Sequence, residues 1–242
     1  MWVIYSYNNH SKSALELANA LAIPVVNEVM PYYKIINWGS SLRMDGPNVI
    51  LNKPEYVAKA VNKIKTFSSL KLLGIPTVPF TFNRDVAARW IAMGKIVYCR
   101  TELNSSSGDG IVIAREIKDL PEDCPLFTQG ILSPAEYRVH VFNNKVIDVS
   151  QKKRVSGEEA NPLIRNYSNH WIFAREDIYI PKVVTTWAKY AVNKMGLNFG
   201  AVDILYKNGT AFILEVNTAP GLQGTTLDNY SKSFKEIIYV TK

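Results

Sequence analysis

Short runs of apolar residues, some alternating with polar ones, predict a chain rich in β-strands. We expect strands at residues 2–7, 24–27, 34–37, 78–82, 96–100, 111–114, 126–129, 136–142 and 145–151. Apolar residues three or four apart predict helices at 11–21, 53–73, 84–93 and 182–195. Strands and helices alternate over residues 1–60, which predicts a small parallel α/β unit. A loop is expected at 155–170.

The segment 201–221 carries the most informative pattern. Two apolar runs flank a Lys-Asn-Gly turn, which predicts a β-hairpin. Glu215 and Asn217 stand two residues apart in its second strand, so their side chains share one face. Pairing can bring Asp203 of the first strand onto that face. Carboxylates among apolar neighbours need a partner or a cation, and hard oxygen ligands suit Mg²⁺. A hairpin with one solvated polar face is the alternative.

Composition limits the class of protein. The chain has 242 residues, 47% of them hydrophobic, enough for one large domain or two to three subdomains. We see no apolar run of about 18 residues and no signal peptide at the start. Cys99 and Cys124 show neither metal spacing nor a disulfide framework, so a cytoplasmic location is expected. The net charge of +7 favours acidic partners such as a nucleotide triphosphate, an acidic peptide or nucleic acid.

A polar loop at residues 105–110, Ser-Ser-Ser-Gly-Asp-Gly, lies between two predicted strands. Its glycines permit a backbone that aims successive N–H groups at an anion, such as a nucleotide phosphate. Arg100, just before the loop, suits the same anion as a fixed charge. An ordinary hairpin turn and a surface arginine are the alternatives for these two features.

Taken in order, these features resemble the ATP-grasp superfamily. A strand, a basic residue, a Gly/Ser loop and a strand precede a distant hairpin with Asp203, Glu215-Val-Asn217 and then Pro220-Gly221. The likeness is strongest to carboxylate–amine ligases, such as D-alanine–D-alanine ligase and the glutamate ligases that modify a ribosomal protein. It implies an α+β fold in which two subdomains grip ATP, after a small Rossmann-like unit. The units would be residues 1–60, a lid at 61–128 and a C-terminal subdomain at 129–242.

The resemblance also implies which residues bind ATP and metal. For ATP these are Lys63 and Arg100 at the phosphates, Ser107, Gly108, Asp109 and Gly110 over them, Gln129, Gly130 and Ile131 at the adenine, Glu136 at the ribose, and Leu214 against the base. Arg100 and Gln129 depart from the family, which usually has a lysine and an acidic residue there. Asp203, Glu215 and Asn217 match ligands of Mg²⁺, with Glu215 bridging two ions and Mn²⁺ as a substitute.

In this family a substrate carboxylate attacks ATP to form an acyl phosphate, and an amine then displaces the phosphate. Cations must therefore surround the metal site. Our candidates for this catalytic role are Arg138, Lys152, Arg154 and Arg165, with Asn169 and His170 as candidate substrate contacts. His140, among apolar residues, is expected to be structural. D-alanine–D-alanine ligases carry an oxyanion-binding arginine at the position of Ala201, which argues against a D-alanine dipeptide as product.

Two alternatives remain open at this stage. One is a kinase on the same fold that phosphorylates an acidic small molecule. The other is a non-catalytic nucleotide- or nucleic-acid-binding module, which the charge and the 13 tyrosines allow. No stripe of interleaved basic and aromatic residues supports nucleic acid. For the ligase, glutamate or a peptide terminus is the expected substrate, and no membrane contact is expected. Whether the protein is a homodimer stays open.

Overall fold

The computed structural model describes residues 1–104, 110–132 and 134–240. Its N-terminal part is a parallel sheet in the order β2-β1-β3-β4. The strands are β1 (Trp2–Ser6), β2 (Val25–Val26), β3 (Lys34–Trp38) and β4 (Val49–Leu51). Helix α1 (Lys12–Leu21) follows β1, and the Ser11 side chain caps it by accepting from the Ala14 N–H. The expected α/β alternation is present, with β4 as an unforeseen fourth strand.

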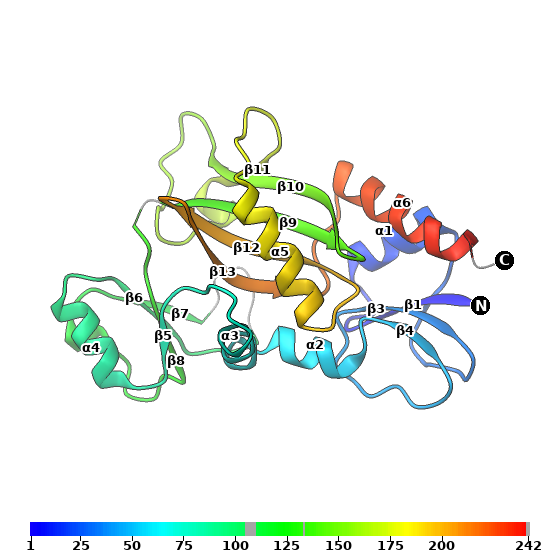
Figure 1. Cartoon of the computed structure of the whole chain (residues 1–242), viewed down its shortest axis with the longest axis horizontal. Coiled ribbons are helices and arrows are strands. Elements are labelled where there is room, and N and C mark those ends of the chain that lie inside the picture. Colours follow the sequence, from blue (N-terminus) through cyan, green and yellow to red (C-terminus); the bar gives the residue numbers. More distant parts are fainter. Residues whose placement is uncertain (105–109, 133, 241–242) are drawn as a thin grey trace.

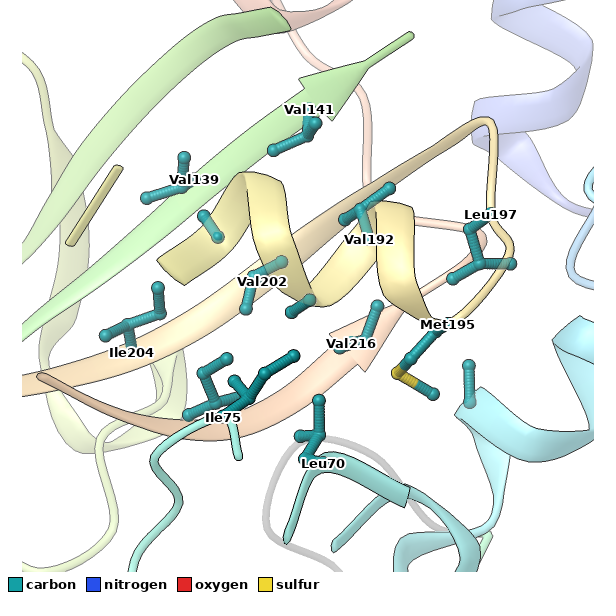
Figure 2. Packing of buried hydrophobic residues seen from close by; sticks show 14 of the residues in the cluster. Leu70, Ile75, Val139, Val141, Val192, Met195, Leu197, Val202, Ile204 and Val216 are labelled. Atoms are coloured by element: carbon teal, nitrogen blue, oxygen red, sulfur yellow. The ribbon is translucent and has the colours of Figure 1, made fainter. Parts of the chain in front are cut away.

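A five-stranded antiparallel sheet forms the centre of the molecule, in the order β11-β10-β9-β12-β13. Its strands are β9 (Ala135–Phe142), β10 (Lys145–Arg154), β11 (Trp171–Ala174), β12 (Phe199–Lys207) and β13 (Thr210–Asn217). Helix α5 (Lys182–Lys194) lies across one face (Figure 1). Figure 2 shows Val139, Val141, Val202 and Val216 of the sheet packed beneath Val192 of this helix. One face of the sheet is thus the main core, and the other is available for the site.

A second antiparallel sheet, β5-β8-β6-β7, lies to one side with helix α4 (Arg84–Ala92) against it (Figure 1). Its strands are β5 (Phe80–Thr81), β6 (Val97–Arg100), β7 (Ile111–Ala114) and β8 (Leu126–Gln129). It has its own small core, which includes Ile91, Cys99 and Phe127. The chain enters it along the edge of β13, where the Ile213 N–H donates to the Pro76 carbonyl over 3.0 Å.

The single helix expected at 53–73 is wrong: two helices occupy this segment, α2 (Pro54–Val61) and α3 (Lys63–Leu72). Asn62 between them is extended, with φ −93° and ψ 115°, and its side chain accepts from the Lys65 N–H. Asparagine favours such an N-cap position, because its short side chain satisfies a free N–H of the first turn. The break places Lys63 at the start of α3.

Helix α6 (Thr225–Val240) packs beside α1 (Figure 1). This helix was not predicted from the sequence. Tyr230 of α6 and Trp38 of β3 meet Phe199 of β12 in one aromatic cluster. Asn52 adds polar links, since its side chain donates to the Phe199 carbonyl over 2.9 Å. The N-terminal sheet is therefore fixed to the central one. Within the described part of the chain, no helix has the length and apolar character needed to cross a membrane.

Candidate active site

A cavity of about 960 Å³ lies on the face of the central sheet that α5 leaves uncovered. The small sheet, the start of α3 and the segment 162–167 line one part of it. The first turn of α1 and the segment 219–226 line the other. We call the first part the nucleotide end, after the role that the resemblance to the ATP-grasp superfamily predicts for it, and the second part the far end. Most of the residues proposed from sequence line the nucleotide end.

Strand register gathers the hairpin residues on this face. Asp203 pairs with Glu215 on β13, and Ala201 pairs with Asn217. On the other side of β12, Asp203 pairs with Arg138 of β9. Residues directly opposite one another in antiparallel strands point to the same face. The three proposed metal ligands and one candidate cation therefore form a continuous polar patch on the cavity floor.

A β-bulge adds Leu214 to this patch. The register shifts between Asp203 and Ile204, so that Ile204 pairs with Ile213 and Leu214 is the extra residue. Ile213 is fully buried in the core beneath α5, whereas Leu214 and Glu215 both line the cavity. Strict alternation would have put Leu214 and Glu215 on opposite faces. The bulge thus places an apolar side chain and a carboxylate at the same site.

Arg138 and Asp203 form a two-pronged ion pair. Nε and an Nη nitrogen of Arg138 donate to the two carboxylate oxygens, each over 2.7 Å. Burial disfavours the charged form of both groups, but the charge of the partner favours it more strongly in each case. The pKa of Asp203 consequently lies below its ordinary value and the pKa of Arg138 above it. Both groups are charged in the folded protein at neutral pH.

A second buried ion cluster surrounds Glu136, which is only 5% exposed. Lys152 of β10 lies 2.6 Å from one carboxylate oxygen, and Arg165 lies 3.7 Å from the other. Burial raises the pKa of Glu136, and the two cations oppose that shift. Lys152 also donates to the Arg165 carbonyl over 2.7 Å. The cluster therefore ties the loop after β10 to the sheet.

Lys63 and Arg100 lie on the wall above Glu215. Burial lowers the pKa of both, and the Glu215 carboxylate opposes the shift in each case. The Nε atom of Arg100 is buried and has no hydrogen-bond partner among the described residues. Its guanidinium lies 6.0 Å from the centre of the Phe67 ring. Two desolvated cations beside a carboxylate make a strong site for anions and a metal ion together.

The segment Gln129–Gly130–Ile131 passes along the cavity wall. The N–H groups of Gln129 and Gly130 donate to the carbonyls of Pro79 and Ile96, each over 2.8 Å. The Ile131 N–H has no acceptor among the described residues. Of the three N–H groups in this segment, that of Ile131 is thus the one that remains for a ligand. A side chain at Gly130 would meet the Tyr98 ring at 2.9 Å, so this position requires glycine.

Some candidates from the sequence do not reach the cavity. Arg154 lies outside its lining and stacks over Trp171 at 5.5 Å. Asn169 is bound to Asn166, and the exposed His170 lies 3.8 Å from Glu158. Gly110 is also outside the lining, with a positive φ of 64° that favours glycine. Ser107, Gly108 and Asp109 lie outside the described residues.

Several lining residues escaped the sequence reasoning. Phe173 lies beneath Arg138 at 4.5 Å, and the Tyr98 hydroxyl donates to the Leu163 carbonyl over 3.1 Å. Arg175, directly after β11, lines the far end. The spacing of Trp171 and Phe173 is a usable signal, because residues two apart in a strand share one face, here opposite Arg154 and Lys152. It was missed because the segment is short and follows a long loop.

The donor set fits a hard cation. Asp203, Glu215 and Asn217 line the cavity and offer two carboxylates and one amide. Among the described residues, no group of three or more His, Cys, Asp or Glu side chains that could hold a metal ion is found. The oxygens of Asp203 and one oxygen of Glu215 already accept hydrogen bonds from Arg138 and Asn217. Each carboxylate oxygen has a second lone pair, which leaves room for a metal ion. A cation held here by Asn217 would require its amide oxygen to turn inward, because its amide nitrogen donates to Glu215 over 2.7 Å.

Comparison with curated proteins finds relatives of low sequence identity. No family model matches the chain. A probable alpha-L-glutamate ligase of Saccharophagus degradans is 25% identical over 229 residues, which is 84% of this chain and 74% of the relative. A protein of the same description from Ectopseudomonas mendocina is 27% identical over 188 residues, 72% of this chain and 60% of that longer relative.

Solved structures show the same fold. The ATP-grasp ligase PsnB, solved with a minimal precursor, Mg and ADP, superposes with a TM-score of 0.68 at 15% identity and covers 100% of this chain and 97% of its own. D-alanine–D-alanine ligase from Bacillus anthracis gives 0.66 at 16% identity, covering 99% and 96%. The chain has the ATP-grasp fold, which confirms the fold predicted from sequence. The relatives described as glutamate ligases support the predicted class of ATP-dependent carboxylate–amine ligases.

Proposed function

We propose that this protein activates a substrate carboxylate with ATP and Mg²⁺ and joins it to an amine, with release of ADP and phosphate. The observation that carries this is the strand register, which places Asp203, Glu215 and Asn217 on one face beside Arg138. The relatives' description as glutamate ligases supports glutamate or a peptide terminus as substrate.

In this proposal the nucleotide end binds ATP. Lys63 and Arg100 neutralise the phosphates, and the loop with Ser107, Gly108, Asp109 and Gly110 covers them. The adenine contacts Leu214 and accepts from the Ile131 N–H beside Gln129 and Gly130. Glu136 accepts hydrogen bonds from the ribose hydroxyls. Its ion pairs with Lys152 and Arg165 pre-orient the carboxylate for this contact.

Asp203, Glu215 and Asn217 are proposed to hold Mg²⁺, with Glu215 shared between two ions and Mn²⁺ as a substitute. A bound ion would neutralise phosphate charge as ATP is cleaved. The chain's own contribution is a set of fixed cations. Arg138 is oriented by Asp203, whereas Lys152 and Arg165 are oriented by Glu136. Arg154 would act at the rim, with Asn169 and His170 as outer substrate contacts.

The organisation of the chain follows from the same likeness. We propose residues 1–60 as the unit before the ATP-grasp domain, 61–128 as its lid and 129–242 as its metal-binding subdomain. Two copies are proposed to form a homodimer. Sedimentation analysis of the purified chain tests this assembly directly.

The test of function is the release of ADP and phosphate from ATP in the presence of paired substrates. Amino acids and short peptides are supplied with and without an amine, and the products are identified by mass spectrometry. We expect ADP release that requires both substrates and a product with a new amide bond. A stable phosphorylated product would indicate a kinase instead. Release of AMP and pyrophosphate would contradict the proposal.

A further inference from the structure

The far end of the cavity contains a charged cluster that none of the proposed catalytic roles uses. Asp148 of β10 pairs in register with His140 of β9, whose ring lines the cavity. Asp148 is buried, with 8% of its surface exposed, and Thr226 in the first turn of α6 is 4% exposed. Arg175 joins them from the end of β11. A buried acidic group whose two hydrogen-bonding partners come from separate parts of the chain is a costly arrangement that needs an explanation.

Arg175 is fixed along one edge of its guanidinium. Its Nε donates to one Asp148 oxygen over 3.1 Å, and Nη2 donates to the other over 2.7 Å. Nη2 also donates to the Thr226 hydroxyl, which in turn donates to Asp148 over 2.6 Å. Such two-pronged contacts define the plane of the guanidinium as well as its position. The side chain is therefore pre-organised before any ligand binds.

The opposite edge of this guanidinium is available. Within the described chain, Nη1 of Arg175 has no hydrogen-bond partner, and the residue lines the cavity. Its side chain is 35% exposed, in contrast to the buried Asp148. A guanidinium held by one carboxylate and open on its other edge suits a second carboxylate.

The surroundings favour an anion at this place. Thr226 lies in the first turn of the 16-residue helix α6, and the N-terminus of this helix contributes partial positive charge. Lys12 and Glu16 also line this end of the cavity, 3.8 Å apart as an ion pair, so together they add no net charge. Burial, and then the charge of Arg138, lower the pKa of His140 to about 4, so the ring is neutral at pH 7. The triphosphate of ATP has its own cations, Lys63 and Arg100, at the nucleotide end.

We propose that Arg175 binds a substrate carboxylate other than the one that is activated, so that the far end selects an acidic amino acid or a peptide that ends in one. This inference rests on the proposed ligase function and adds a selective contact to it. Arg175 would act as a substrate-binding residue, with Asp148 and Thr226 as its positioning residues.

Calorimetric titration tests the proposal without turnover. L-glutamate, L-glutamine and glutamic acid α-amide are titrated into the enzyme saturated with Mg²⁺ and a non-hydrolysable ATP analogue. For the wild type we expect glutamate to bind about 10–100-fold more tightly than one of the two amides, since that amide lacks the bound carboxylate. In Arg175→Gln the preference should fall to about twofold or less, and Arg175→Lys should retain part of it. The affinity for the ATP analogue should not change.

Removal of Arg175 alone leaves Asp148 buried without its partner, which can unfold the protein. The double variant Asp148→Asn with Arg175→Gln removes both charges and keeps the test valid. Arg43→Gln is the matched control, because Arg43 pairs with Asp45 on the surface and does not line the cavity. It should behave as the wild type.

Three outcomes would overturn the inference. The first is that the wild type does not bind glutamate or does not prefer it to either amide. The second is that the Arg175 variants keep the preference. The third is that these variants lower the affinities for glutamate and both amides equally. None of these would contradict the ligase reaction itself. That reaction fails on a separate result, the absence of ADP release with every carboxylate–amine pair.

Discussion

The two ends of the cavity are built in different ways. At the nucleotide end, the proposed metal ligands and Arg138 come from three neighbouring strands of one sheet, where spacing along each strand fixes the face on which a side chain lies. The far end combines Asp148 of β10, Arg175 after β11 and Thr226 of α6, which meet only in the folded chain. The proposed metal site therefore lies on one sheet, whereas the proposed contact for the second carboxylate lies where separate elements converge. We expect that the two can be disrupted independently.

The largest effect is expected from the metal ligands. Asp203→Asn or Glu215→Gln should lower ATP turnover by about 1,000-fold, because each removes a charge that stabilises the transferring phosphate. Substrate-dependent ADP release is the measurement. Since Asp203→Asn also deprives Arg138 of its partner, thermal unfolding must show that the variant is folded.

Asp45→Asn, at an exposed acidic residue, serves as the control and should keep full activity. Unchanged turnover in both metal-ligand variants would mean that ATP hydrolysis does not use this site. The proposed division into a nucleotide end and a far end would then be wrong.

The next largest effect is expected at Glu136, the proposed acceptor for the ribose hydroxyls. Glu136→Gln should raise the KM for ATP by about 10–100-fold, because a charged acceptor for the ribose hydroxyls is lost. The affinity for the carboxylate substrate should change much less, which separates this residue from Arg175. Glu116→Gln, in the exposed pair with Lys118, is the control. Equal losses of ATP and substrate affinity in Glu136→Gln would indicate a general collapse of the ion cluster.

Alanine substitutions at the neighbouring residues Ile213 and Leu214 test whether the β-bulge serves nucleotide binding. Ile213→Ala should lower the free energy of unfolding by about 2–5 kcal/mol, since it opens a cavity under α5. Leu214→Ala should be milder in stability but weaken binding of an ATP analogue by roughly 5–30-fold through lost apolar contact. Urea denaturation and calorimetry measure the two effects. If Leu214→Ala leaves nucleotide affinity unchanged, the bulge does not serve adenine binding.

The last effect, which acts on stability and leaves the reaction itself untouched, is a pH dependence at the far end. The pKa of His140 is about 4 in the folded protein, below the ordinary value of 6.5. As the pH falls below 6.5, the unfolded chain takes up this proton first, so the His140 contribution to stability is lost toward pH 4. Glu136, whose pKa burial raises, acts in the opposite direction.

Comparison with His140→Gln isolates the histidine contribution. The difference in free energy of unfolding between wild type and variant should shrink by about 1.4 kcal/mol for each pH unit over which the two states differ by a proton. Urea denaturation at several pH values gives this difference. A constant difference between pH 7 and pH 4.5 would contradict the assignment.

Features that depend on spacing within one strand could be predicted from the sequence, whereas features that depend on contacts between elements could not. The hairpin face with Asp203, Glu215 and Asn217 could be predicted, because a period of two residues is a local property of a strand. The bulge that brings Leu214 to this face could not, because it depends on pairing between two strands. The helix break at Asn62 was missed since both flanking segments have helical periodicity.

Long-range geometry explains the remaining misses. Nothing in the sequence around Arg175 indicates that Asp148 and Thr226 will hold its guanidinium, since these residues lie 27 and 51 positions away. Asn169 and His170 were candidates by likeness alone, and the loop turns them to Asn166 and Glu158 instead. Loop residues are placed by tertiary contacts, which strand or helix periodicity does not encode.

The central claim is that a substrate carboxylate is activated by ATP at the sheet face. The most direct measurement supplies the substrate with its carboxylate oxygens labelled by a heavy isotope and determines the label in the released phosphate by mass spectrometry. Since an acyl phosphate leaves its bridging oxygen with the phosphate, we predict one labelled oxygen in the phosphate for each amide formed. Amide formation with unlabelled phosphate would contradict the account.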